Sequence, residues 1–208
     1  MKKGFTLIEM LIVIGIIAVL TGASISGFSA MRKSAERARA RELCLQIKTA
    51  LEAIWSEDGI WPKTIRQKNS AADSILDEEV AYILASRGKM NLTYDTSPGS
   101  TSRKTTGADR FGVLSPWGYD VVKRRGSGAS LTTKVGKGTV QDHLFRFKVD
   151  LDGDGVIDGA SVGGESVNIR ATAAVWCAGK DGVMKPYSKG LKSDDIYSWA
   201  PGQAVNVK

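Results

Sequence analysis

The chain begins MKKGFTLIEMLIVIGIIAVL (residues 1–20), and from Phe5 to Met31 its only charged residue is Glu9. At about 1.5 Å per residue, a helix over residues 5–31 would be roughly 40 Å long, which is enough to cross a bilayer. We therefore predict a transmembrane helix over 5–31. A carboxylate inside hydrocarbon costs about 2.5 to 3.5 kcal/mol even on insertion scales, so Glu9 needs a specific role.

The helical pattern continues beyond this apolar segment. Apolar residues recur at intervals of four, four and three positions, which is the period of one helix face; they are Leu43, Ile47, Leu51 and Ile54. Gly59 and Pro62 supply the signals that end a helix. We expect one helix to residue 58, with residues 32–58 as its amphipathic, soluble half. This continuity argues against the alternative, a secretory signal cleaved near Ala23.

Residues 2–9, KKGFTLIE, resemble the class III signal of type IV pilins and type II secretion pseudopilins. In that signal a short basic leader ends in Gly, an aromatic residue follows the cleaved bond, and a Glu lies close behind it. The resemblance implies that prepilin peptidase removes residues 1–4 by cleaving between Gly4 and Phe5, and that the Phe5 amine is methylated. It also implies a filament of mature helices, in which Glu9 pairs with the Phe5 amine of its own or a neighbouring subunit. A buried acid is tolerated when it is paired.

The same resemblance implies a single-pass protein of the bacterial inner membrane, with residues 59–208 as a globular periplasmic domain. The implied partners are further copies in a homopolymer, other pseudopilins, an inner-membrane assembly platform and prepilin peptidase. Counting basic residues gives no orientation, because Lys2 and Lys3 on one flank face Arg32, Lys33 and further arginines on the other.

The composition indicates one modest soluble core. Charged residues make up 25% and hydrophobic residues 42% of the 208 residues, which is ordinary for a globular protein. The net charge of +7 does not predict nucleic-acid binding, because no run interleaves basic residues with stacking aromatic side chains. The single histidine, His143, lies beside Asp142, and no Gly-x-Ser-x-Gly nucleophile motif occurs, so we do not expect an enzyme.

The domain after the helix is predicted to contain a small antiparallel sheet. Apolar and polar residues alternate over 145–149 and over 167–175, with the period of half-buried strands. Residues 115–118, Ser-Pro-Trp-Gly, resemble the Asp-Pro-Trp-Gly turn that leads into the first strand of major pseudopilins. We expect residues 119–124 to form that strand.

The segment 64–110 carries the fewest structural signals, and we treat it as a variable insertion. Its apolar residues between Ile75 and Leu84 favour a short helix. The expected fold class is therefore α+β, with a long N-terminal helix packed on a small antiparallel sheet in a type IV pilin-like arrangement.

Two cysteines, Cys44 and Cys177, are too few for a metal cluster. If the domain is exported, one disulfide between the long helix and the C-terminal region is permitted. Equally, the two cysteines can be small buried side chains. Type IV major pilins usually close a C-terminal loop with two cysteines that are near in sequence, and this pair does not fit that pattern.

Residues 150–158, DLDGDGVID, match much of a calcium-loop template, with acids at positions 1, 3, 5 and 9 and a backbone carbonyl at position 7. Ser161 takes the place of the usual Glu at position 12, so we predict a hairpin loop rather than an EF-hand. An Asp-Gly turn joining two strands is the alternative. The candidate ligands are Asp150, Asp152, Asp154, Asp158 and the carbonyl of Val156.

A second calcium loop is implied by resemblance alone. Residues 177–182, CAGKDG, and 193–199, SDDIYSW, resemble the two motifs that flank the Ca²⁺ loop of major pseudopilins. The implied ligands are the side chains of Asp181, Asp194 and Asp195 and the carbonyl of Ala178. The intervening segment carries three lysines, which lower the local negative charge: Lys185, Lys189 and Lys192.

The leading hypothesis is a structural subunit of a type II secretion pseudopilus that drives the export of folded proteins, with Ca²⁺ as a cofactor. A type IV or competence pilus subunit, acting in adhesion, motility or DNA uptake, is an alternative with the same N-terminus. A membrane-anchored, calcium-dependent adhesin is a second alternative, because residues 150–158 would serve it equally well.

Overall fold

The computed structural model describes residues 6–69, 74–90, 111–190 and 193–206. The two residues of the implied cleavage site, Gly4 and Phe5, lie outside this described part. The chain divides into two compact units, residues 1–38 and residues 39–208.

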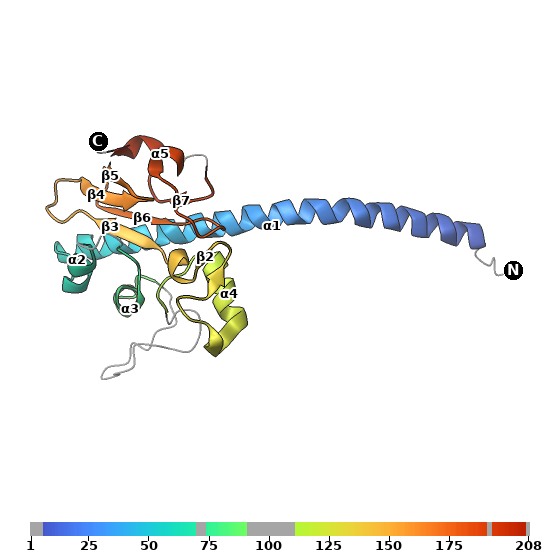
Figure 1. The fold of residues 1–208 in the computed structure, drawn as a ribbon, viewed down its shortest axis with the longest axis horizontal. Helices are drawn as coiled ribbons and strands as arrows, with labels where there is room; N and C mark the ends of the chain where they lie inside the picture. The colour runs from blue at the N-terminus through green and yellow to red at the C-terminus, as the bar shows by residue number, and fades with distance from the viewer. Residues whose placement is uncertain (1–5, 70–73, 91–110, 191–192, 207–208) are drawn as a thin grey trace. The chain divides into compact units, whose positions relative to one another are not determined.

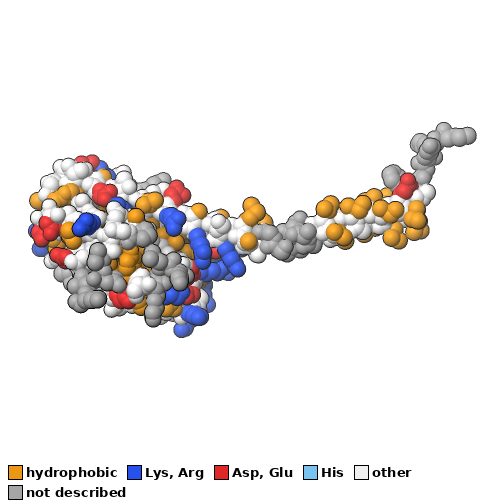
Figure 2. Space-filling view, turned by 90° about the horizontal axis from the view of Figure 1, so that it is seen from above, with side chains coloured by type: hydrophobic (Ala, Val, Ile, Leu, Met, Phe, Trp, Pro, Cys, Tyr) orange, Lys and Arg blue, Asp and Glu red, His pale blue; other side chains and the backbone are white. Residues whose placement is uncertain are grey.

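Helix α1 (Leu7–Asp58) forms most of the first unit and continues into the second. Large apolar side chains near its start are exposed, including Leu7 at 84% and Val19 at 73%. Figure 2 shows apolar side chains in orange along this stretch. Within the described residues, no helix combines the length and the apolar character needed to span a membrane.

In the second unit, α1 contributes one fully buried face. Its members lie three or four positions apart and have no exposed area: Ala40, Cys44, Ile47, Leu51 and Ile54. The helix ends at Asp58. Gly59 follows with a φ of 65° and donates its N–H to the Trp55 carbonyl at 2.8 Å. The amphipathic half and the glycine-terminated end are thus as the sequence predicted.

The described β structure comprises two antiparallel sheets of three strands and one short hairpin (Figure 1). The first sheet has the order β3-β6-β7, formed by β3 (Arg146–Val149), β6 (Ala173–Cys177) and β7 (Ile196–Tyr197). The second has the order β4-β5-β8, formed by β4 (Ile157–Val162), β5 (Glu165–Ile169) and β8 (Ala204–Asn206). The hairpin pairs β1 (Lys134–Val135) with β2 (Gly138–Thr139).

The second unit also contains four short helices among its described residues. They are α2 (Lys63–Asn69), α3 (Glu78–Ser86), α4 (Pro116–Arg125) and α5 (Tyr187–Gly190). The short helix expected over 75–84 is α3. It begins at Glu78 because the Asp77 side chain accepts hydrogen bonds from the backbone N–H groups of Glu79 and Val80 and so caps the helix.

Strand β6 is buried along its whole length and lies between two hydrophobic clusters. Ala173, Val175 and Cys177 belong to the cluster that includes the buried face of α1, whereas Ala174 and Trp176 belong to the cluster under the β4-β5-β8 sheet. The helix α1 and the β4-β5-β8 sheet thus pack on opposite faces of one strand of the β3-β6-β7 sheet, and the predicted α+β class is confirmed.

One strand prediction was wrong in detail. The run 167–175 was expected to be a single half-buried strand, but it forms parts of β5 and β6, which belong to different sheets. The chain turns at residues 170–172, where the Arg170 N–H donates to the Gln203 carbonyl and the Thr172 carbonyl accepts from the Asp150 N–H. After this turn both faces of β6 are buried, so its residues no longer alternate between a buried face and an exposed face.

The strand predicted over 119–124 is also wrong, because these residues lie in helix α4. Ser115 is extended, and Pro116 takes the first helical position, where its missing N–H costs nothing. Trp117 and Val122 are buried, whereas the three basic residues of the last turn are exposed. Their positive charges lie at the C-terminal end of the helix, where they interact favourably with the helix dipole. The turn seen in the sequence therefore starts a helix rather than a strand.

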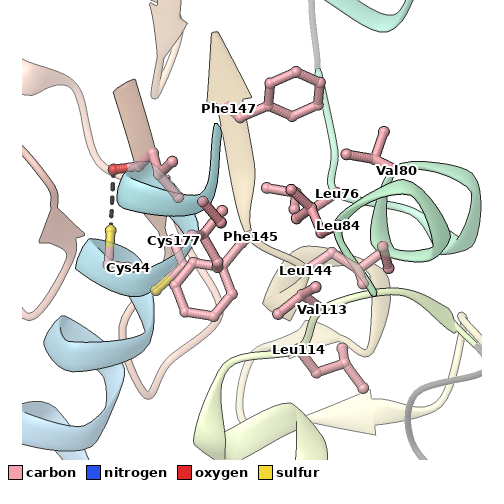
Figure 3. Packing of buried hydrophobic residues seen from close by; sticks show 14 of the residues in the cluster. Cys44, Leu76, Val80, Leu84, Val113, Leu114, Leu144, Phe145, Phe147 and Cys177 are labelled. Carbon is pink, nitrogen blue, oxygen red and sulfur yellow. Dashed lines mark hydrogen bonds between the residues drawn. The ribbon is translucent and has the colours of Figure 1, made fainter. Parts of the chain in front are cut away.

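The two cysteines are free thiols with no exposed area. Figure 3 shows Cys44 on α1 and Cys177 from β6 within the core, and the Cys44 Sγ donates a hydrogen bond to the Val175 carbonyl at 3.1 Å. Burial raises the pKa of both thiols. The interpretation as two small buried side chains describes this structure, and the alternative disulfide is not formed in it.

The contact between α1 and β6 predicts a large difference between two leucines on the same helix. Leu51→Ala should lower the free energy of unfolding by about 2–5 kcal/mol, because Leu51 is completely buried and its loss leaves a cavity. Leu45→Ala is the control, since Leu45 is 47% exposed, and it should change stability by no more than about 0.5 kcal/mol. Equal losses in urea unfolding would contradict the packing described here.

Candidate functional site

The start of α1 is closed by a reciprocal capping arrangement between Thr6 and Glu9. The Glu9 Oε2 accepts hydrogen bonds from the backbone N–H and the hydroxyl of Thr6, both at 2.8 Å. In return, the Glu9 N–H donates to the Thr6 hydroxyl at 3.4 Å. This is a capping box, which satisfies donors that the first helical turn leaves open.

The capping box was missed in the sequence although its signature, Thr-x-x-Glu, is present. It directs the Glu9 carboxylate toward the N-terminal end of α1. Gly4 and Phe5, named as the cleaved and methylated residues, fall outside the described part of the chain. Their implied roles stay predictions.

The first acidic loop, residues 150–156, joins β3 to β4. It was expected to be a hairpin loop, but β3 pairs with β6 and β4 pairs with β5, so the loop crosses from one sheet to the other. The Asp150 carbonyl accepts a hydrogen bond from the Trp61 indole N–H. Since Trp61 follows α1 closely, this bond holds the loop beside the C-terminal end of that helix.

Three carboxylates of the first acidic loop converge. One oxygen atom each from Asp150, Asp152 and Asp154 lies within 4.8 Å of the others. The Asp150 carboxylate also accepts the N–H groups of Gly153 and Gly155, each at 2.8 Å. These glycines have φ values of 80° and 82°, a backbone conformation that favours glycine.

The pKa values of Asp150 and Asp152 are shifted in opposite directions. Burial alone would raise the pKa of Asp150, but the N–H donors of Gly153 and Gly155 outweigh it and hold the pKa below its usual range. The hydrogen bond to Asp150, followed by the charge of Asp154, raises the pKa of Asp152. A converging set of hard carboxylate oxygens is the ligand chemistry that Ca²⁺ prefers.

The remaining two candidate ligands of this loop behave differently. The Val156 N–H donates to the Asp154 carboxylate at 2.7 Å, so Val156 stays next to the cluster. Asp158 is exposed on β4, and within the described residues it is not among the carboxylates that converge. The structure thus brings together three of the four acids predicted here.

The C-terminal acidic loop consists of residues 178–185 and 193–195, and Asp195 lies at its centre. Asp195 is only 8% exposed. Its carboxylate accepts hydrogen bonds from the N–H groups of Gly179 and Lys185, both at 3.1 Å, and from the Ser193 hydroxyl at 2.7 Å. Burial nevertheless raises the pKa of Asp195 above its ordinary value.

Asp181 and Asp194 face a lysine. The Lys185 ammonium lies 3.6 Å from a carboxylate oxygen of each. The Lys180 N–H donates to Asp194 at 2.8 Å, and the Val183 N–H donates to Asp181 at 3.0 Å. The charge of Asp181, followed by that of Asp194, raises the pKa of Lys185.

The two acidic loops therefore differ in whether their carboxylates are arranged to bind Ca²⁺. The carboxylates of Asp181, Asp194 and Asp195 do not form a mutually close group among the described residues, unlike those of the first acidic loop. Their oxygens are held by backbone N–H groups, by Ser193 and by the Lys185 ammonium. With the Lys185 ammonium between Asp181 and Asp194, the implied set with the Ala178 carbonyl does not fit a divalent cation. The converging carboxylates of the first acidic loop do fit one.

Histidine 143 lies at the junction of α4, the β1–β2 hairpin and the C-terminal acidic loop. It has no exposed area. Its Nδ1 lies 3.1 Å from the Ser115 hydroxyl, and its Nε2 lies 3.4 Å from the Val135 carbonyl. Because a carbonyl only accepts, Nε2 carries the proton and Nδ1 accepts from Ser115. A Cβ on Gly182 would lie 2.9 Å from Nε2, so the imidazole requires glycine there.

This arrangement is structural rather than catalytic. Asp142 accepts hydrogen bonds from the N–H and hydroxyl of Thr139, both at 2.8 Å. The His143 Nε2 therefore contacts a carbonyl, that of Val135, rather than a carboxylate. Ser115 and His143 are both fully buried, so no substrate could reach the serine hydroxyl.

Comparison with known proteins places the N-terminus in a defined class. Residues 1–25 match the family model described as the prokaryotic N-terminal methylation motif. The chain is 30% identical over 98 residues to the type IV major pilin protein PilE of Neisseria gonorrhoeae, which covers 47% of this chain and 59% of that relative. The chain thus spans less than two thirds of the relative's length. No solved structure matches the chain.

These similarities agree with the fold described above. A long N-terminal helix packed on small antiparallel sheets, with a methylation motif that extends over the start of the helix, is a type IV pilin-like architecture.

The buried imidazole predicts a pH dependence of folding. Burial lowers the pKa of His143 below its ordinary value, so below about pH 6.5 the unfolded chain binds a proton that the folded chain resists. The free energy of unfolding should therefore fall as the pH decreases from 7 toward 5, by about 1.4 kcal/mol for each unit between the two pKa values.

His143→Gln isolates this contribution, because the chain has no other histidine. Glutamine keeps a donor and an acceptor but does not titrate. The variant should be less stable at pH 7 and should lose less stability than the wild type on acidification, measured by urea unfolding at each pH. Identical slopes for the two proteins would rule out His143 as the titrating group.

Proposed function

We propose that this type IV pilin-like chain is a major pseudopilin, a filament subunit of a type II secretion system that is cleaved, N-methylated and polymerised to drive the export of folded proteins. The observation that carries the proposal is the methylation motif over residues 1–25, which coincides with the exposed apolar side chains at the start of α1. Exposed apolar surface of this extent needs a lipid or protein neighbour.

Glu9 supports an assembly role. Cleavage after Gly4 would create a charged amine at Phe5, directly before Thr6, and the Glu9 carboxylate already points to that end of the helix. Charge-assisted hydrogen bonds between an ammonium and a carboxylate are about twice as strong as neutral ones. Before assembly, the same apolar segment would hold the subunit in the bacterial inner membrane with the second unit in the periplasm.

The partners follow from this assignment. The chain would meet prepilin peptidase at the cytoplasmic face of the membrane and then further copies of itself, other pseudopilins and the assembly platform. The free, buried state of Cys44 and Cys177 favours secretion over a pilus, because neither cysteine closes a C-terminal loop.

A type IV pilus subunit is the second candidate, and the similarity to the PilE major pilin favours it. The two candidates share processing and polymerisation but differ in the filament produced. Electron microscopy at native expression distinguishes them, since a pilus forms long extracellular fibres and a pseudopilus stays within the periplasm.

The paired-charge role of Glu9 can be separated from its capping role. Glu9→Gln keeps a capping side chain at this position, because Gln serves in a capping box as Glu does, whereas Glu9→Ala removes both cap and charge. If the charge is needed, both variants should abolish filaments and secretion, with intact mass confirming loss of residues 1–4 and gain of one methyl group. A Glu9→Gln protein that assembles at the wild-type level would show that the cap alone suffices.

We also propose that the first acidic loop binds Ca²⁺. Three converging carboxylates repel one another, and a divalent cation would relieve this repulsion. Ca²⁺ at about 100 times its Kd should stabilise the full chain by about 2.7 kcal/mol over chelator. Asp152→Asn with Asp154→Asn should remove this shift, whereas Asp120→Asn, an exposed acid on α4, should preserve it. A shift that survives the double substitution would place the ion elsewhere.

A further inference from the structure

The C-terminal acidic loop is organised around one residue, Lys185. Its backbone N–H donates to Asp195 at 3.1 Å, and its ammonium lies 3.6 Å from both Asp181 and Asp194. One lysine thus contacts three carboxylates that come from two separate segments of the chain.

The loop is built so that the carboxylates cannot move far from this lysine. A Cβ on Gly179 would lie 2.3 Å from the Asp194 Cγ, so glycine is needed for the close approach of residues 194 and 179. The N–H groups of Gly179 and Lys180 bind Asp195 and Asp194 respectively, at 3.1 and 2.8 Å. These contacts hold Asp194 and Asp195 beside residues 179 and 180.

The neighbouring hairpin packs against the other side of the same loop. The Lys137 and Gly138 N–H groups donate to the Asp181 carbonyl at 2.9 and 3.1 Å. A Cβ on Gly136 would lie 2.8 Å from the Lys180 carbonyl, and one on Gly138 would lie 2.6 Å from the Gly182 carbonyl. The acidic loop is therefore held closely on both sides, and its negative charge needs a local counter-ion.

We infer that the Lys185 ammonium is the resident cation of the C-terminal acidic loop and takes the place of a divalent metal ion there. It bridges Asp181 and Asp194 across the junction between the residues after β6 and those before β7. Because the cation is covalently attached, the loop keeps its conformation at any calcium concentration. Removing the ammonium while leaving the three aspartates would convert the loop into a site that demands an external cation.

The test compares Lys185→Met with Lys137→Met, a substitution of an exposed lysine in the adjacent hairpin. Thermal unfolding and equilibrium Ca²⁺ binding are measured on the full chain in detergent. In chelator, Lys185→Met should lower Tm by about 2–4 °C relative to the control, and Ca²⁺ should restore it with one more bound ion than the wild type. Lys185→Arg keeps the positive charge, so it should match the wild type in both measurements.

Two results would overturn the inference. If Asp194→Asn removes a bound Ca²⁺ from the otherwise unchanged chain, the loop already holds a metal ion in the presence of Lys185. If Lys185→Met and Lys137→Met have the same Tm and bind the same number of ions, the ammonium is not the counter-ion. Counting the change in bound ions keeps this test separate from any ion in the first acidic loop.

Discussion

The burial of β6 on both faces is the constraint on which the second unit depends. A strand that is buried on both faces needs a packing partner on each face. Here α1 packs on one face of β6, and the β4-β5-β8 sheet packs on the other. Since the α1 face contains only Ala, Cys, Ile and Leu, the helix and the strand specify each other mainly through packing, with one hydrogen bond from the Cys44 thiol to the Val175 carbonyl.

This arrangement also determines where the two acidic loops lie. Strand β3 runs antiparallel to β6, with Val149 opposite Ala173 and Arg146 opposite Trp176. The first acidic loop follows Val149 and therefore lies at the start of β6, whereas the C-terminal acidic loop follows Cys177 at its end. The two loops thus occupy opposite ends of one strand pair.

The sequence predicted those parts of the structure in which one local signal was sufficient. The period of Leu43 to Ile54 and the glycine after Asp58 were enough to define α1 in the second unit, because helix propensity and packing agree there. The strand prediction for residues 119–124 was wrong because it rested on the resemblance of residues 115–118 to a turn before a strand, whereas Pro116 takes the first position of a helix. The division between β5 and β6 could not be seen, because a strand buried on both faces loses its alternation.

The candidate metal sites were also predictable from the sequence only where one short segment supplies all the side chains. Asp150, Asp152 and Asp154 lie within one short loop, and the Gly153 and Gly155 N–H groups fold that loop around the Asp150 carboxylate, so the three carboxylates converge. The C-terminal aspartates come from two segments, so their spacing said nothing about how their oxygens are oriented, and the three lysines between the motifs were read only as a reduction of charge. The position of Lys185, whose backbone and side chain both bind aspartates, depends on the path of the chain between β6 and β7.

Two acidic loops of one chain therefore illustrate two ways of holding carboxylates together. In the first, backbone N–H groups hold the pKa of Asp150 below its usual range, and the hydrogen bond to Asp150 raises the pKa of Asp152. In the second, an ammonium from the same loop balances the charge. A motif that marks metal ligands by their acids alone does not distinguish these cases, because the decisive group is the cation that the chain itself supplies.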